Sequence, residues 1–251
     1  MVMRTIVVAA HLAAGMILMA GMAHAAEIKV LASAAIKTAY LELLPEFERA
    51  SGHQVLTTWA PTAEMAKRVR EGETVDLVIM AVEPIDELIT LGRITPGSRV
   101  DLAKSGIGVA VRPGAPRPDI SSTEALRRTL LAAKSITFST GLSGIYVTGM
   151  FERMGIADEL KSRIRVVKGV PIAIVLERGD AEIGFQQSSE LLAVKGVNYL
   201  GPLPAALQRV FVFAAAVPAV ATQPDAARAL ARFLTTPAAA AVIRKTGLEP
   251  G

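Results

Sequence analysis

Short apolar segments alternate with helix-like segments through most of this chain, and that alternation constrains the fold more than any other feature. Apolar runs of strand length lie at residues 28–31 and 54–58, and residues with helical spacing follow each run. Residues 75–81, Val-Asp-Leu-Val-Ile-Met-Ala, are nearly all apolar, which is typical of a strand buried on both faces. Strands that alternate with helices predict an α/β fold built on parallel sheets.

The first 25 residues have the pattern of a secretory signal peptide. A short positive start ends at Arg4, an apolar stretch covers residues 5–22, and Ala23-His24-Ala25 fits the small-residue cleavage pattern. A membrane anchor or a buried first helix is the alternative, but the apolar stretch is near the lower limit for a membrane span. We therefore expect residues 1–25 to be removed from a secreted protein.

The composition excludes several classes of site. The chain has no cysteine, and of its three histidines only His53 lies beyond the predicted signal peptide. Disulfides, thiolate catalysis and a zinc site with two histidines are therefore excluded, and we expect neither a metal nor a cofactor. The formal net charge is +4, without a dense run of basic residues, so nucleic acid is not an expected partner.

Three turns share one form: a strand ends, small or hydroxyl residues follow, and a helix begins. They lie at residues 33–35, 60–63 and 139–146. A helix start presents free N–H groups and the positive end of its dipole, which together favour an anion. Each turn taken alone is also an ordinary helix cap. Because the carboxyl ends of parallel strands meet at one edge, we expect the turns to form one anion site without lysine or arginine.

A fourth feature is Gln186-Gln187-Ser188-Ser189, which follows the apolar residues 181–185. Amide side chains at the end of a buried strand are placed to contact a ligand. Since successive side chains of a strand point to opposite faces, we expect only one glutamine to face the site, and we favour Gln187.

The order of these segments resembles the periplasmic molybdate-binding proteins of ABC transporters. The resemblance covers the whole mature chain, and the segments that carry it are Lys-Val-Leu-Ala-Ser-Ala-Ala at 29–35, residues 75–79, Gly-Ile-Tyr at 144–146, residues 181–184, and the tail from Pro237 to Gly247. It implies a type 2 periplasmic-binding fold, in which two α/β lobes, each a mostly parallel sheet flanked by helices, are joined by two crossing segments. The expected limits are 26–107 plus 214–251 for lobe 1, 108–213 for lobe 2, and crossings near 106–111 and 212–217.

The resemblance also implies a function, namely a monomeric periplasmic binding protein rather than an enzyme. It would hold an oxyanion of the molybdate or tungstate class between its lobes and deliver it to a membrane permease. The ligand-binding residues it implies are Ser33, Ala34, Ala35, Thr62, Ala63, Ser143, Gly144, Gly169 and Gln187.

The chain departs from that family at the ligand. Ala35 stands where the family has a serine, Ser143 replaces an alanine, Gln187 replaces a tyrosine, and Thr62 keeps a hydroxyl. A small organic carboxylate is therefore the alternative ligand. A secreted serine hydrolase that uses Ser143 or Ser188 is a further alternative, but the only histidine beyond the signal peptide, His53, would lie at the wrong end of the sheet.

Overall fold

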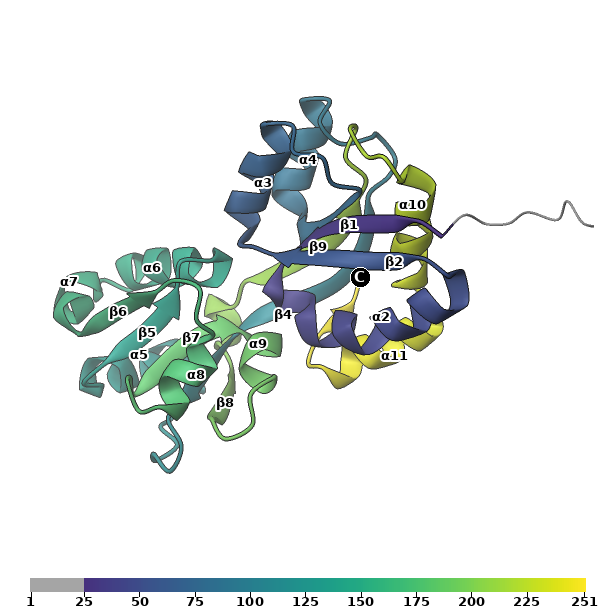
Figure 1. Ribbon diagram of the computed structural model, residues 1–251. Helices are drawn as coiled ribbons and strands as arrows, with labels where there is room; N and C mark the ends of the chain where they lie inside the picture. The colour runs from purple at the N-terminus through teal and green to yellow at the C-terminus, as the bar shows by residue number, and fades with distance from the viewer. Residues whose placement is uncertain (1–24) are drawn as a thin grey trace, which may run out of the picture.

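The structure, a computed structural model, describes residues 25–251 and consists of two α/β lobes joined by long strands (Figure 1). Strands β1, β2 and β3 run parallel in the first lobe, and β5, β6 and β7 run parallel in the second. The predicted two-lobe α/β fold is thus confirmed. The strands are β1 (Glu27–Ala32), β2 (Gln54–Trp59), β3 (Leu77–Ala81), β4 (Val100–Val111), β5 (Ile136–Ser139), β6 (Ile164–Val167), β7 (Ile183–Gln187), β8 (Asn198–Pro202), β9 (Val210–Ala216) and β10 (Glu249–Pro250).

Helices cover both faces of each sheet. In β3, Leu77 and Ile79 pack into the core on the side of α2, whereas Val78 and Met80 pack against α3 and α4. Burial on both faces explains why this strand is almost entirely apolar. The helices are α2 (Lys37–Ser51), α3 (Thr62–Arg70), α4 (Val82–Thr90), α5 (Thr123–Ala132), α6 (Leu142–Arg153), α7 (Ala157–Leu160), α8 (Ile172–Glu177), α9 (Ser188–Leu192), α10 (Pro224–Phe233) and α11 (Pro237–Lys245), with short 3₁₀ turns η1 (Ala34–Ile36), η2 (Lys161–Arg163) and η3 (Ala205–Leu207).

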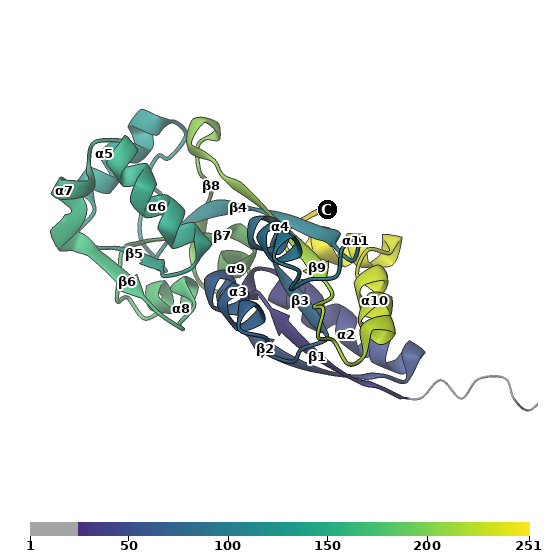
Figure 2. The same cartoon turned by 90° about the horizontal axis from the view of Figure 1, so that it is seen from above.

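Strand β4 crosses from one lobe to the other (Figure 2). It pairs with β9 as far as Gly106, which lies opposite Val210, and with β7 from Ile107 onward. Just before β9, Gln208 Nε2 donates to the Ile107 carbonyl at 3.0 Å, and Gln208 Oε1 accepts from the Ile107 N–H at 2.9 Å. The two crossing segments are therefore bonded to each other. The return crossing precedes Val210, which is earlier than the predicted 212–217.

Helix α2 continues through Pro45, a residue type that usually kinks or splits a helix. Proline removes one backbone hydrogen bond and crowds the preceding turn. Pro45 lies on the exposed face, where water can solvate the freed carbonyl, while Tyr40, Leu43 and Phe47 bury the other face. That burial keeps the helix continuous across the proline.

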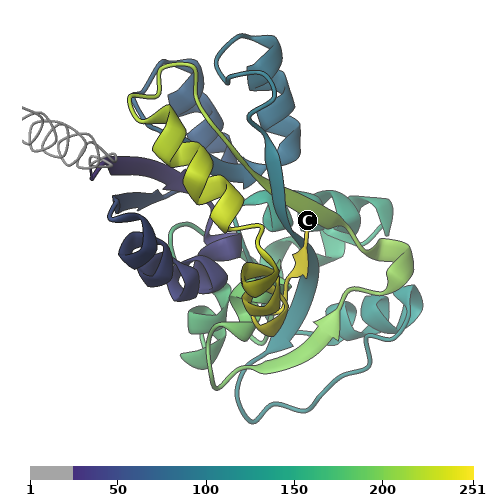
Figure 3. The ribbon, with the colours of Figure 1, turned by 90° about the vertical axis from the view of Figure 1, so that its right-hand side faces the viewer.

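The C-terminal residues close the first lobe. Strand β10, which the sequence did not predict, pairs antiparallel with β4 (Figure 3). Between residues 25 and 251, no helix combines the length and the apolar character that crossing a membrane requires. The predicted signal peptide lies outside the described residues, apart from Ala25.

Candidate functional site

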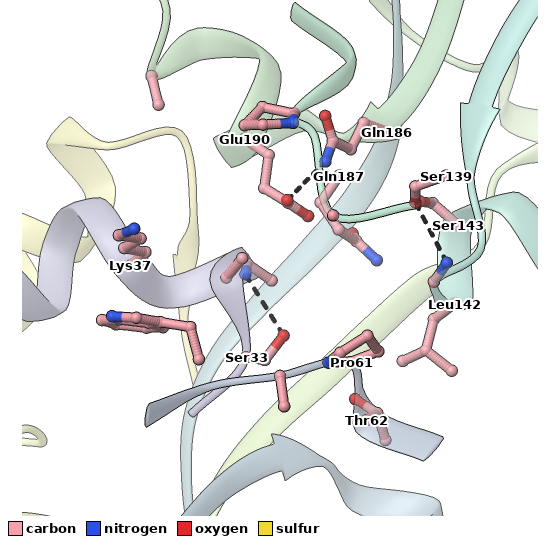
Figure 4. A pocket seen from close by; sticks show the side chains of 18 of the residues that line it. Ser33, Lys37, Pro61, Thr62, Ser139, Leu142, Ser143, Gln186, Gln187 and Glu190 are labelled. Atoms are coloured by element: carbon pink, nitrogen blue, oxygen red, sulfur yellow. Dashed lines mark hydrogen bonds between the residues drawn. The ribbon is translucent and has the colours of Figure 1, made fainter. Parts of the chain in front are cut away.

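A cavity of about 400 Å³ lies between the two lobes, at the carboxyl ends of the parallel strands (Figure 4). This is the edge at which α/β sheets bind their ligands. The predicted residues that line it are Ser33, Ala34, Ala35, Thr62, Ser143, Gly169 and Gln187. Ala63 and Gly144 were also predicted but do not line it. The three turns predicted to converge therefore do meet around one space, whereas their role in ligand binding stays a prediction.

The wall from the first lobe is built by the turns after β1 and β2. Ser33 caps the first turn, since its Oγ accepts from the Ala35 N–H at 3.3 Å and its own N–H donates to the Ile79 carbonyl at 2.8 Å. After β2, Pro61 leads into α3, and the buried Thr62 is the first residue of that helix. Small residues at both turns let the two helix starts approach the same space.

The wall from the second lobe depends on a close approach of α6 to β5. The helix begins at Leu142, inside the turn expected at residues 139–146, so Ser143 lies in its first turn. A Cβ on Gly144 would lie 1.7 Å from the Ser139 carbonyl oxygen, so any side chain there would separate helix from strand. Gly144 thus sets the position of the wall without lining it. Gly169 adopts φ +73°, a left-handed conformation that glycine allows at low cost.

Both glutamines line the cavity, so the prediction that only one would face it was wrong. The alternation of a strand does not hold at Gln187, because the chain turns there directly into α9. The hydrogen-bond partners place Gln187 Nε2 within 3.1 Å of Ser105 Oγ and 3.2 Å of the Gly106 carbonyl, so its N–H groups hold the crossing strand β4. Gln186 Oε1 accepts from the Ile172 N–H at 2.9 Å.

Two ionisable residues line the cavity that the sequence analysis did not place there. Lys37 lies in the first turn of α2, with its Nζ 5.1 Å from the centre of the Trp59 ring. The predicted absence of lysine and arginine was therefore wrong. On the opposite lobe, Glu190 in α9 accepts a hydrogen bond from Gln186 Nε2 at 2.6 Å. Burial raises the pKa of the Glu190 carboxyl to about 7, although the bond from Gln186 lowers it in part.

The sequence did contain signals for both residues. Lys37 lies two residues after the small-residue turn at 33–35, and Glu190 lies three residues after Gln187 at the end of β7. The burial of Glu190, however, depends on the approach of the two lobes. That approach is visible in a buried hydrogen bond between the lobes, from Ser189 Oγ to the Ala35 carbonyl at 2.7 Å.

His53 lies far from the cavity. Its Nδ1 accepts from the Ala26 N–H at 3.1 Å and so connects the loop before β2 to the segment preceding β1. These residues lie at the amino ends of β1 and β2 in the first lobe, whereas Ser143 and Ser188 follow the carboxyl ends of β5 and β7 in the second lobe. His53 therefore cannot serve as the base for either serine, and no other histidine lies within residues 25–251.

Comparison with known proteins gives four further findings. The sequence profile of the family described as bacterial extracellular solute-binding protein matches residues 28–249. A protein named aconitate isomerase, from Pseudomonas sp, is 35% identical over 229 residues, which cover 89% of this chain and 87% of that protein. The molybdate-binding protein ModA of Escherichia coli is 24% identical over 73% of this chain and 74% of its own. In structure, the periplasmic molybdate-binding protein of Azotobacter vinelandii superposes with a TM-score of 0.73 at 19% identity, covering 88% of this chain and 98% of that one.

Proposed function

Because the chain belongs to the bacterial extracellular solute-binding protein family, we propose that it binds a small polycarboxylate between its lobes. In this role it acts outside the cytoplasmic membrane, in the periplasm, and passes its ligand to the permease of an ABC transporter. The ligand is an anion, held by hydroxyl and N–H donors from both lobes. Closure of the lobes around the ligand excludes water and strengthens these hydrogen bonds.

The observation that carries the choice of ligand is the pair of ionisable side chains on opposite walls. Lys37 gives the first lobe a cation for one carboxylate, and Glu190 gives the second lobe a carboxyl group with an elevated pKa. An elongated acid with several carboxyl groups can contact both walls at once. The volume of about 400 Å³ also falls within the roughly 300–1,000 Å³ of typical organic-ligand pockets.

A tetrahedral oxyanion of the molybdate or tungstate class is the other ligand considered. The fold similarity to molybdate-binding proteins supports it, and so do Thr62 and Ser143 in the cavity wall. Two features weigh against it. Ala35 carries no hydroxyl to donate, and Glu190 adds a carboxyl to a wall where a dianion needs hydrogen-bond donors. The greater identity to the Pseudomonas protein named aconitate isomerase also favours a carboxylate.

A thermal-shift panel of molybdate, tungstate, sulfate, phosphate and several di- and tricarboxylates tests the proposal. A ligand at 100 times its Kd stabilises a protein by about 2.7 kcal/mol, which is roughly 5–11 °C in Tm for a chain of this size. We expect that shift with a tricarboxylate. A shift with molybdate or tungstate alone, or with no compound, contradicts the proposed ligand.

Two variants connect that shift to the cavity. Thr62→Val and Ser143→Ala should abolish it while leaving the Tm of the free protein nearly unchanged. The matched controls are Thr90→Val and Ser162→Ala, at exposed positions away from the cavity, which should keep the shift. Equal shifts in all four variants would show that Thr62 and Ser143 do not contact the ligand.

Isomerisation of an unsaturated tricarboxylate is a second candidate function, favoured by Glu190. Moving a double bond along such an acid requires a proton to leave one carbon and a proton to be added at another. A carboxyl group with a pKa of about 7 can accept and return that proton at neutral pH. Incubation with cis-aconitate or trans-aconitate, followed by chromatography of the two isomers, tests this. Conversion that is lost in Glu190→Gln supports it, and absence of conversion supports a binding protein only.

A further inference from the structure

Gln186 fixes how Glu190 can be protonated. The Gln186 Oε1 atom accepts from the Ile172 N–H at 2.9 Å, which leaves the amide nitrogen on the side of Glu190. That nitrogen donates to Glu190 Oε2 at 2.6 Å. Oε2 is therefore held as an acceptor, and a proton on the carboxyl group has to reside on Oε1. Figure 4 shows the second carboxyl oxygen directed into the cavity, so a proton on Oε1 faces the cavity.

The surroundings of Glu190 offer little to stabilise its charged form. Helix α9 packs against β4, β7, β8, η1, α2 and α8. Among the described residues that line the cavity from these elements, Lys37 on α2 carries the only other charge, and its Nζ lies over the Trp59 ring. Tyr199 on β8 donates to Ser188 Oγ at 3.0 Å, and β7 contributes the two uncharged glutamines.

We propose that ligand binding is coupled to the uptake of one proton by Glu190, whose Oε1–H then donates a hydrogen bond to a carboxylate of the ligand. This inference rests on the proposed polycarboxylate function and adds a pH dependence to the same site. An ionised Glu190 repels the ligand, whereas the protonated form binds it. Gln186 acts as the positioning residue, because it decides which carboxyl oxygen carries the proton.

A pKa near 7 sets the expected size of this coupling. Burial holds the pKa of Glu190 near 7 in the free protein, so above that pH each binding event must first protonate the carboxyl group. The dissociation constant then rises about tenfold for each further pH unit, or roughly 25-fold between pH 6.5 and 8.5. Glutamine at this position can donate the same hydrogen bond through its amide but does not titrate.

Isothermal titration with tricarballylate, the saturated analogue of aconitate, tests the coupling, because this acid cannot isomerise. Titrations at pH 6.5 and 8.5, and at pH 8 in two buffers with different ionisation enthalpies, give the affinity ratio and the number of protons taken up. We expect the full-length mature protein to show a ratio of about 25 and an uptake close to one proton. Glu190→Gln should show a ratio near one and no uptake. Glu159→Gln, an exposed glutamate in the same lobe, is the control and should behave like the unmodified protein.

The outcomes separate the two proposals. If tricarballylate binds with the same affinity at both pH values, or if Glu190→Gln retains the pH dependence, proton coupling is wrong while the polycarboxylate function stands. If tricarballylate and the other carboxylates fail to bind at either pH, the proposed function is wrong, and the coupling falls with it.

Discussion

The two glycines of α6 allow a stringent test of how the wall of the second lobe is built. A Cβ on Gly144 would lie 1.7 Å from the Ser139 carbonyl oxygen and 3.1 Å from Phe138 Cδ2. A Cβ on Gly149, in the same helix, would meet only the flexible end of Arg153 at 3.3 Å. The same substitution by alanine should therefore have opposite effects at positions that share one helix.

Gly144→Ala forces the start of α6 away from β5 by more than about 1 Å, because non-bonded atoms resist closer contact. Overpacking costs typically 1–3 kcal/mol, and we expect about 2–3 kcal/mol because the obstacle is backbone. At roughly 2–4 °C per kcal/mol, the Tm should fall by about 4–12 °C. Gly149→Ala instead removes a helix-interior glycine, which should stabilise by about 0.5–1 kcal/mol and raise the Tm by roughly 1–4 °C.

Ligand affinity should differ between Gly144→Ala and Gly149→Ala in the same way as stability does. Ser143 precedes Gly144 in the first turn of α6 and moves with it. The loss of one hydrogen bond to a charged ligand costs about 1.5–3 kcal/mol, so Gly144→Ala should weaken the tightest ligand of the panel at least about tenfold. Thermal melts and isothermal titration of both variants measure these effects. Equal Tm values and equal affinities for the two variants would refute the argument that Gly144 sets this wall.

Three further changes test other parts of the structure. Asp76→Asn should lower stability by about 1–3 kcal/mol at pH 7, because Asp76 accepts from the N–H groups of Lys29, Thr222 and Gln223. Burial alone would raise the pKa of Asp76, but these hydrogen bonds lower it, so urea melts should show the difference from the unmodified protein shrinking below about pH 4. Pro45→Ala should raise the Tm, since it restores an interior hydrogen bond of α2, and an unchanged or lower Tm would mean that the proline costs nothing there. Without ligand, Glu190→Gln should be more stable than the unmodified protein at pH 8 and equally stable near pH 4. Because the pKa of Glu190 is raised to about 7, the cost of ionising it in the folded state builds up between about pH 4 and 7 and persists at pH 8. Melts in which Glu190→Gln differs from the unmodified protein by the same amount at pH 4 and pH 8 would argue against this.

The sequence was sufficient for the fold and for the location of the cavity. Within each lobe, parallel strands end at a common edge, so the small-residue turns after β1 and β2 could be predicted to meet. The resemblance to two-lobe binding proteins placed the turn after β5 on the facing lobe. The continuity of α2 through Pro45 was not predictable in this way, because it depends on Tyr40, Leu43 and Phe47 burying the opposite face. The extent of β4 was also missed. Its first half pairs with β9, a segment distant in sequence, rather than following a local apolar pattern.

The charges of the cavity could not be predicted for a different physical reason. Whether Glu190 is neutral or ionised depends on its desolvation and on the amide of Gln186, and both arise only when β7, α8 and α9 pack together. A glutamate on a helix is normally exposed to water, so the sequence pattern gives no sign that Glu190 would be buried in the cavity wall. Backbone turns of this kind suit a tetrahedral oxyanion and a carboxylate alike, since both anions accept from N–H and hydroxyl donors. In the proposed function, the choice between these ligands rests with Lys37 and Glu190, two side chains that line opposite walls of the cavity but that the fold does not itself require.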